Sequence, residues 1–218
     1  QLVLPVPSGL AAEAAPGEVA LTWDDLNEPQ ELVFAYGDGT MESFISSTAD
    51  WEIGAGWANK YSTGLQTTLQ TFSYVLSSGN TELPGALEPI IVTVWDGNAD
   101  IIYESDPVTP TAMDELLTFD LSSANVTVMG DFYIGWTYTH VTYPYTAMDS
   151  DSDTEGMGYQ WDPPGSMISL AGSGIDGNYP LWVTGMTTSD GGLSYNVYRR
   201  EESSGFSSPL NAAPLALA

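Results

Sequence analysis

Residues 17–23 read GEVALTW, and this stretch decides how the N-terminal region folds. Val19, Leu21 and Trp23 recur at every second position, so their side chains share one face of an extended strand. A Pro-Gly pair gives a turn signal where the strand begins, and the residues before that pair are also strand-like. The sequence therefore predicts a β-hairpin that ends in a buried tryptophan.

The composition of the whole chain favours the same kind of structure. The 218 residues are 43% hydrophobic, which is enough to bury one sizeable core or two small ones. They include 22 Gly, 14 Pro, 12 Tyr and 7 Trp, and these residues favour strands joined by tight turns. Because no segment shows helical periodicity, we expect an all-β protein.

Residues 27–188 contain a series of segments in which apolar and polar residues alternate. The predicted strands are Glu31–Tyr36, Gly56–Tyr61, Gln66–Leu76, Ile90–Trp95, Ile101–Glu104, Leu116–Leu121, Asp131–Tyr138 and Leu181–Met186. Turn signals separate them, among them residues 36–40, 77–80, 96–100 and 171–178. Strands at this spacing are typical of a jelly roll or a related β-sandwich.

The chain is strongly acidic, with 29 Asp and Glu residues against Lys60, Arg199 and Arg200, and its formal net charge is −26. Such a surface repels phosphate, so nucleic acid and anionic membranes are poor partners. The charge favours divalent cations, or a salty environment that screens self-repulsion. No apolar run approaches the roughly 18 residues that cross a bilayer, so no membrane insertion is expected. The absence of cysteine excludes disulfides and thiolate metal sites.

Two short motifs near the N-terminus resemble strands A and B of a fibronectin type III domain: P-x-P-x-x-L at residues 5–10 and G-x-V-x-L-x-W at residues 17–23. The strand C motif Y-x-V-Y of that family comes about 170 residues later, within Leu193–Arg199. The resemblance implies an insertion between strands B and C. The implied segments are residues 1–26 and 189–218, the two parts of the fibronectin-like domain, and residues 27–188, an inserted jelly-roll sandwich.

The fibronectin-like part is expected to be incomplete. After Tyr198 the sequence supplies at most one more strand, whereas a sandwich of this type has about seven. Either the polypeptide is longer, or another subunit supplies the missing strands by β-augmentation.

The inserted segment resembles a jelly-roll module of secreted, multidomain bacterial and archaeal surface proteins, in which it is accessory, adhesive or structural. The matching residues are Glu31-Leu32, Tyr36–Glu42, Gly54–Trp57, Val92–Asp96, Gly130–Gly135 and Tyr145–Asp151. The sequence departs from the family at Met157–Tyr159, where Arg-Ser-Tyr is usual, and any site that relies on this arginine is therefore in doubt. The resemblance implies an extracellular, cell-surface protein.

The stretch MDSDSDTEGMGYQW at residues 148–161 is the best candidate for calcium binding. Asp149, Asp151 and Asp153 stand at positions 1, 3 and 5 of an EF-hand loop. Thr154 and Gln160, however, replace the required Gly and Glu, so the loop is not an EF-hand. Several carboxylates in one turn can still gather Ca²⁺ with help from elsewhere, because calcium tolerates irregular coordination. The alternative is a solvated acidic turn.

The jelly-roll resemblance implies where that help comes from, since calcium in related modules sits where the first strand meets a late loop. Asp38 or Glu42 would then meet the Asp149–Asp153 turn. The loop Asp96–Asp100 also offers oxygen ligands, but its Asp-Gly and Gly-Asn pairs favour an ordinary hairpin turn.

Aromatic residues offer a second kind of site, a stacking platform for sugars. Trp57, Trp95, Trp136 and Trp182 lie in strand-like patterns and are expected in the core. The candidates for exposed, ligand-binding aromatics are Trp51, Trp161, Tyr143 and Tyr145.

The sequence argues against an enzyme. His140 is the only histidine, which excludes a histidine metal triad, and no G-x-S-x-G motif is present. With so many carboxylates, a pair at catalytic spacing would arise by chance. His140 is expected at a strand end, and no catalytic residue is assigned.

The expected function is that of an extracellular structural or adhesive protein that forms a filament, sheath or surface layer. The apolar segment QLVLPV at residues 1–6 would pair with the open sheet edge of a neighbouring copy. The alternative is a carbohydrate-binding accessory module of a secreted multidomain enzyme, and a hydrolase is a third hypothesis.

Overall fold

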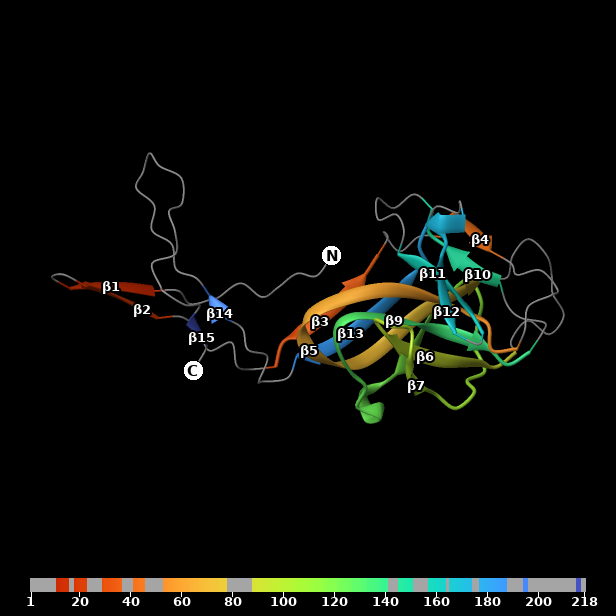
Figure 1. The fold of residues 1–218 in the computed structure, drawn as a ribbon, viewed down its shortest axis with the longest axis horizontal. Helices are drawn as coiled ribbons and strands as arrows, with labels where there is room; N and C mark the ends of the chain where they lie inside the picture. Colours follow the sequence, from red (N-terminus) through yellow and green to blue (C-terminus); the bar gives the residue numbers. More distant parts are fainter. Residues whose placement is uncertain are drawn as a thin grey trace.

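The structure, a computed structural model, describes residues 29–36, 41–45, 53–77, 88–140, 145–150, 157–163, 165–173 and 177–187 (Figure 1). For residues 11–15, 18–22, 145, 194–195 and 215–216 it describes the backbone alone. The strands are β1 (Ala11–Ala15), β2 (Glu18–Thr22), β3 (Glu31–Ala35), β4 (Ser43–Ile45), β5 (Gly56–Ser77), β6 (Ile90–Asp96), β7 (Ile101–Glu104), β8 (Leu116–Asp120), β9 (Thr127–Tyr138), β10 (Tyr145–Met148), β11 (Gly158–Asp162), β12 (Ser166–Ser169), β13 (Leu181–Thr187), β14 (Ser194–Tyr195) and β15 (Leu215–Ala216).

Helices are almost absent from the described residues, which contain only the 3-10 turns η1 (Ser122–Ala124) and η2 (Ala171–Ser173). None of these described residues forms a helix long and apolar enough to cross a membrane. The all-β class expected from composition is confirmed.

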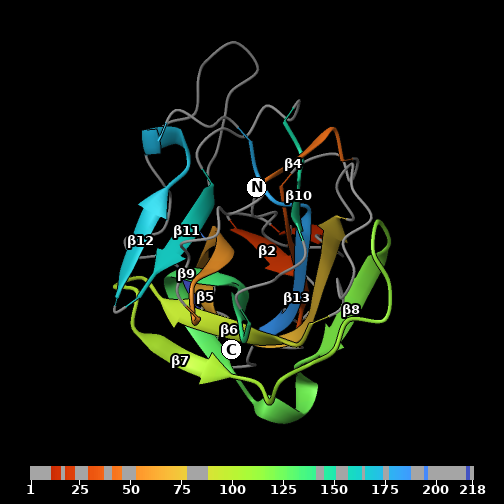
Figure 2. The same ribbon diagram turned by 90° about the vertical axis from the view of Figure 1, so that its right-hand side faces the viewer.

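Eleven strands form one antiparallel sheet with a sandwich-like arrangement. Its main path runs β12-β11-β5-β9-β6-β7, while β13 pairs with β3 and β5, β8 pairs with β5, and β10 pairs with β4 and β5. Figure 2 shows the strands arranged around a common interior.

Strand β5 joins the two layers because it is 22 residues long. Its first part pairs with β11 and β9, and its second part pairs with β13 and β8. The register against β9 shifts between Thr63 and Thr67, an irregularity of the kind that lets a strand pass from one layer to the other. At this bend the Thr63 hydroxyl donates to the Leu65 carbonyl over 2.9 Å and accepts from the Leu65 N–H over 3.2 Å. The Thr63 side chain therefore supplies hydrogen bonds to the backbone groups of Leu65, which do not take part in the β5–β9 ladder.

The main core fills the space between the layers, and it contains large aromatic side chains. Its largest fully buried members are Trp57, Trp136, Tyr179, Phe72, Phe132, Leu69, Leu76, Ile90, Leu121, Ile134 and Leu170. Polar atoms inside it are tied across strands: Trp57 Nε1 donates to Tyr138 Oη over 2.8 Å, and Tyr61 Oη donates to the Leu181 carbonyl over 2.8 Å. The core assignments of Trp57, Trp95 and Trp136 are confirmed, and Trp182 is half-buried.

A second, smaller apolar cluster contains Ala58, Trp95, Tyr133 and Trp161. It requires close contact between β5 and β9, where Gly135 pairs with Ala58. A Cβ atom on Gly135 would lie 1.8 Å from the Trp57 carbonyl oxygen, so only glycine fits there.

The predicted strands agree with the observed ones in most places, with one merger and four omissions. The two segments expected at 56–61 and 66–76 are one continuous strand, β5. Strands β4, β10, β11 and β12 were not expected. The jelly-roll arrangement stays a prediction.

The N-terminal hairpin expected around Pro16-Gly17 is present as β1 paired with β2, from Ala11↔Thr22 to Ala15↔Glu18. Trp23, expected to be buried at the end of this hairpin, lies outside the described residues. Strand β14, in the expected strand C region, pairs with β15 through two residues. Figure 1 shows both pairs outside the eleven-stranded sheet. The fibronectin-like arrangement and the division into residues 1–26, 27–188 and 189–218 stay predictions.

Candidate functional site

Strands β4 and β10 bring the first part of the large sheet to the acidic turn. Met148 pairs with Ser43, and the Glu42 N–H donates to the Met148 carbonyl over 3.2 Å. The Ser150 N–H in turn donates to Glu42 Oε2 over 3.1 Å. The Glu42 side chain therefore reaches the backbone of the turn that begins at Asp149, as the calcium hypothesis requires.

Asp149 itself is fully buried. It forms an isolated antiparallel bridge with Asn178, in which each N–H donates to the carbonyl of the other residue over 2.9 Å. Gly177 has a φ of +136°, and a Cβ there would lie 2.8 Å from the Asp149 carbonyl oxygen. Glycine at this position allows the two late loops to close on each other.

This arrangement can gather oxygen ligands, but the described part of it does not form a complete metal site. Of the five residues expected to bind calcium, Glu42 and Asp149 are described, whereas Asp38, Asp151 and Asp153 lie outside the described residues. Within the described ranges no group of three His, Cys, Asp or Glu side chains is placed to hold a metal ion. Calcium binding at this turn stays a prediction.

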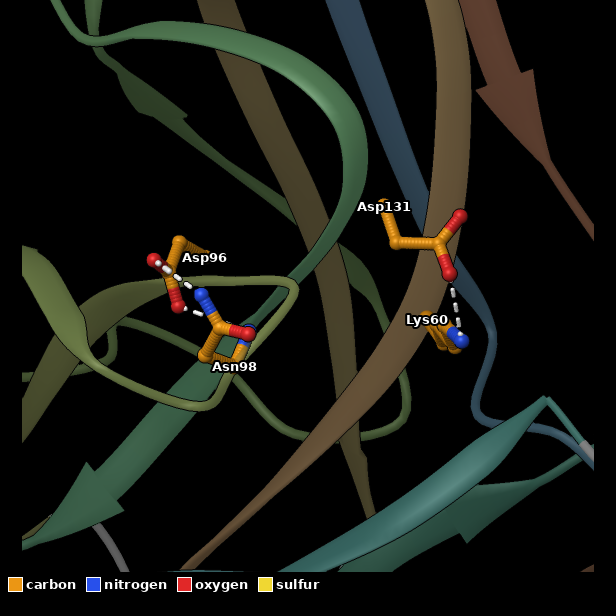
Figure 3. A network of polar contacts seen from close by, with 4 residues as sticks. All are labelled: Lys60, Asp96, Asn98 and Asp131. Atoms are coloured by element: carbon orange, nitrogen blue, oxygen red, sulfur yellow. Dashed lines mark hydrogen bonds and ion pairs between the residues drawn. The ribbon is translucent and has the colours of Figure 1, made fainter.

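The competing loop at residues 96–100 has the chemistry of a tight turn. Asp96 Oδ1 accepts from the N–H group of Asn98 over 2.8 Å (Figure 3). It also accepts from the N–H group of Asp100 over 3.0 Å. The hydrogen bonds from the Asp100 and Asn98 backbone lower the pKa of the Asp96 carboxyl. Ala99 adopts the left-handed conformation with a φ of 69°. These contacts agree with the turn interpretation.

Lys60, the only lysine in the sequence, binds Asp131 across the β5–β9 pair, with Nζ 2.7 Å from Oδ2 (Figure 3). The hydrogen bond to Asp131 raises the pKa of Lys60, and the hydrogen bond from Lys60 lowers that of Asp131. The ammonium also lies 5.7 Å from the centre of the Tyr133 ring. This lysine is therefore part of the surface packing of the sheet.

Of the aromatic residues expected to be exposed, Trp161 is buried. Trp161 is only 6% exposed, because its indole packs against Trp95 with ring centres 5.4 Å apart, so the expected exposure of Trp161 is wrong. The sequence pattern misses this contact because it does not show that the outer face of β5 and β9 is also covered. Trp51 and Tyr143 lie outside the described residues, and only the backbone of Tyr145 is described.

Trp161 nevertheless lines an open, mostly apolar groove of about 420 Å³. The lining residues are Ile53, Gly54, Ile91, Ile101, Glu104, Thr137, Tyr138, Thr139, Trp161 and Pro163. Sequence reasoning missed Ile53 and Ile101, both exposed, although an isoleucine at the end of a strand or in a turn is a signal of an exposed apolar patch. The groove can accept an apolar or ring-shaped group next to one carboxylate.

His140 lies just beyond β9, as expected for a strand-end residue. Its Nε2 lies 3.7 Å from Glu88 Oε2, at the surface. It does not line the groove at Trp161.

No family model matches this chain, and neither a curated protein nor a solved structure shows significant similarity to it.

Proposed function

We propose that this is an extracellular, non-enzymatic structural or adhesive protein that assembles with its own copies by strand exchange into a filament, sheath or surface layer. The observation that carries the proposal is the size of the terminal sheets. In the part of the chain that the structure describes, β1–β2 and β14–β15 are each two-stranded. A two-stranded pair is marginally stable in water and gains most from an added strand.

The donor of that strand is the apolar segment at residues 1–6, QLVLPV. It contains no charged side chain, which matters in a chain with a net charge of −26, because an uncharged segment approaches another copy with the least repulsion. A contact in which each subunit completes the next is head-to-tail and generates a fibre when it does not close.

Deletion of residues 1–7 tests this proposal by sedimentation velocity. The full chain is expected to form polymers, and the deletion variant is expected to remain monomeric with an unchanged β-sheet circular dichroism spectrum. Leu4→Asp should also abolish polymers, whereas Gln1→Asp, which adds the same charge without removing an apolar side chain, should reduce them far less. Polymers that persist after the deletion contradict strand exchange through this segment.

We also propose that Ca²⁺ stabilises the protein at the junction of Glu42 with the Asp149 turn. The Glu42–Ser150 contact supports this, because it brings a carboxylate from the beginning of the large sheet to a loop rich in aspartates. Asp38, Asp151 and Asp153 would supply the remaining oxygen ligands. The net charge would hold a high local concentration of divalent cations around the site.

A second candidate function, carbohydrate binding as an accessory module of a secreted enzyme, is favoured by the groove at Trp161. An apolar wall beside Glu104 suits a sugar ring, which has an apolar face and hydroxyl groups at its rim. Tyr143 and Tyr145 would extend the platform. Glycan-array binding that is lost in Ile101→Asp and Trp161→Ala, by a protein that stays monomeric at high concentration, would favour this function over assembly.

A further inference from the structure

The outer face of the layer formed by β3, β13, residues 71–75 of β5, and β8 carries mainly hydroxyl and aliphatic side chains. We name it the hydroxyl face. Side chains alternate along its strands: Leu32 and Phe34 are buried in the core, whereas Val33 between them is 55% exposed. Leu116 at the opposite edge, on β8, is 56% exposed. Exposed aliphatic residues therefore lie at both edges of one continuous sheet face.

The middle of the hydroxyl face contains hydroxyl groups that bind one another across strands. The Thr71 and Thr184 hydroxyl oxygens lie 2.8 Å apart, and those of Ser73 and Thr118 lie 2.9 Å apart. Half-buried Trp182 pairs with Ser73 in the same rows. In each pair one hydroxyl already donates a hydrogen bond to the other. Burial of the face under a partner would therefore leave fewer hydroxyl groups without a hydrogen bond than burial of unpaired hydroxyls.

The two inner strands of the hydroxyl face, β13 and residues 71–75 of β5, carry no outward charged side chain. The acidic residues among its outward side chains are Glu31 on β3 and Asp120 on β8, on opposite edge strands. The chain as a whole has 29 acidic residues and only 3 basic ones. Two copies repel each other wherever their acidic surfaces meet, so a face whose two inner strands, β13 and β5, carry no outward charge lets them approach at a low electrostatic cost.

We propose that the hydroxyl face is a contact surface for a second copy of this chain, packed face to face about a two-fold axis. This inference rests on the proposed assembly and adds to it a lateral contact between subunits of neighbouring filaments. The terminal strands would link subunits along a filament, and the hydroxyl face would join filaments side by side.

The dimensions of the face explain why this contact would act laterally rather than as a stable dimer. Four strands about 4.8 Å apart and five residues that each rise about 3.3 Å give an area on the order of 300 Å². A stable interface buries about 800 Å² on each partner. A single contact is therefore weak, whereas a row of such contacts along two filaments adds up.

Cysteine cross-linking tests the contact directly, because the chain has no cysteine of its own. The Thr71–Thr184 pair lies on the two inner strands, near the centre of the face. A two-fold axis through the centre of the contact passes near this pair, whether the axis runs along the strands or across them. Thr184→Cys would then face its own copy. The matched control is Ile101→Cys, at a residue that is also exposed but lies on β7 in the other layer.

The proteins are oxidised mildly in about 1 M NaCl, which screens the repulsion between copies. Thr184→Cys is expected to form covalent dimers faster than Ile101→Cys. The expected ratio of the rates is about tenfold, if the equilibrium constant for contact through the face is about tenfold larger than for contact at Ile101. Ser73→Cys, a near-isosteric change on the adjacent row, serves as a second probe if Thr184→Cys does not fold. Equal cross-linking rates for the cysteines on the hydroxyl face and for the control at residue 101 overturn the inference. Equal rates are also expected if the face binds a neutral glycan instead of a second copy.

The result is independent of strand exchange. Fast cross-linking through the face without polymers in sedimentation contradicts the proposed function but leaves the lateral contact standing. Polymers with equal cross-linking rates contradict only the lateral contact.

Discussion

The carboxylate of Glu42 accepts a hydrogen bond from the backbone N–H of Ser150, a residue 108 positions later in the chain. Two hydrogen bonds between Asp149 and Asn178 hold the same turn from its other side. One short segment is thus fixed by residues from the beginning, the middle and the end of the large sheet. A cation bound there would connect parts of the chain that are far apart in sequence, and it would stabilise the native state by binding that state alone.

Replacement of Glu42 should therefore reduce the response of the protein to calcium. At a calcium concentration 100-fold above the Kd, binding adds about 2.7 kcal/mol, which corresponds to a rise in Tm of about 5–10 °C for a chain of this size. Glu42→Gln is expected to lose at least half of this rise. Glu31→Gln removes the same charge from exposed β3 and should respond like the unchanged protein. Equal responses of the two variants in calorimetry would exclude a role for Glu42.

The contact of β5 with β9 should make Gly135 irreplaceable. Gly135→Ala places a methyl group 1.8 Å from the Trp57 carbonyl oxygen, so the strands must separate. The expected loss in the free energy of unfolding is about 3 kcal/mol or more. Gly64→Ala is the matched control, since a Cβ at Gly64 meets no atom within 4 Å, and its effect should lie within about 1 kcal/mol. Urea denaturation measures both, and a Gly135→Ala protein as stable as Gly64→Ala would show that the strands are not this close.

Acid should weaken the β5–β9 pair through Asp131. The hydrogen bond from Lys60 lowers the pKa of the folded Asp131 carboxyl below its ordinary value. Stability from this group is therefore present above the unfolded pKa of about 4 and is lost as pH falls through the lower folded pKa. Asp131→Asn should flatten the dependence of Tm on pH below about 4. Asp162→Asn, at another exposed aspartate, is the matched control. The same slope in the Asp131 variant as in the unchanged protein would contradict this ion pair.

Alkali should weaken the protein through its buried tyrosines. Burial raises the pKa of Tyr74 to about 12 from an ordinary value of 10.0. A raised folded pKa means that the stability is fully present below pH 10 and is lost as pH rises through the folded value. Tyr74→Phe should therefore unfold at higher pH than Tyr103→Phe, in which the ring is only partly buried. Circular dichroism along an alkaline titration measures the midpoints, and coincident midpoints would contradict the expectation.

The fold was predictable where a local pattern determined it, and the candidate site mostly was not. Alternation at period two located β3, β8 and β13, because one face of each strand is more buried than the other. Strands β6 and β7 were also located, although β6 is buried on both faces and β7 is mostly exposed. The strands predicted at 56–61 and 66–76 leave out residues 62–65, yet β5 runs through them, and the Thr63 hydroxyl binds the backbone of Leu65 at the bend.

No local sequence pattern indicates that Trp161 is buried on the outer side of the sheet, because its burial depends on Trp95 from a distant strand. The contact between Glu42 and the acidic turn followed from a resemblance in the order of motifs, whereas the roles of Ser150 and Asn178 depend on backbone groups, which the sequence pattern does not show. The glycine at 177, next to Asn178, was the available signal of a close approach.

Electron microscopy of the purified full chain, in calcium and after addition of a chelator, tests assembly by strand exchange most directly. The expected result is long polymers in calcium that shorten or dissociate in chelator, and no polymers of the variant that lacks residues 1–7 under either condition. Monodisperse single particles of the full chain at high concentration in calcium, at an ionic strength that screens its charge, would contradict self-assembly.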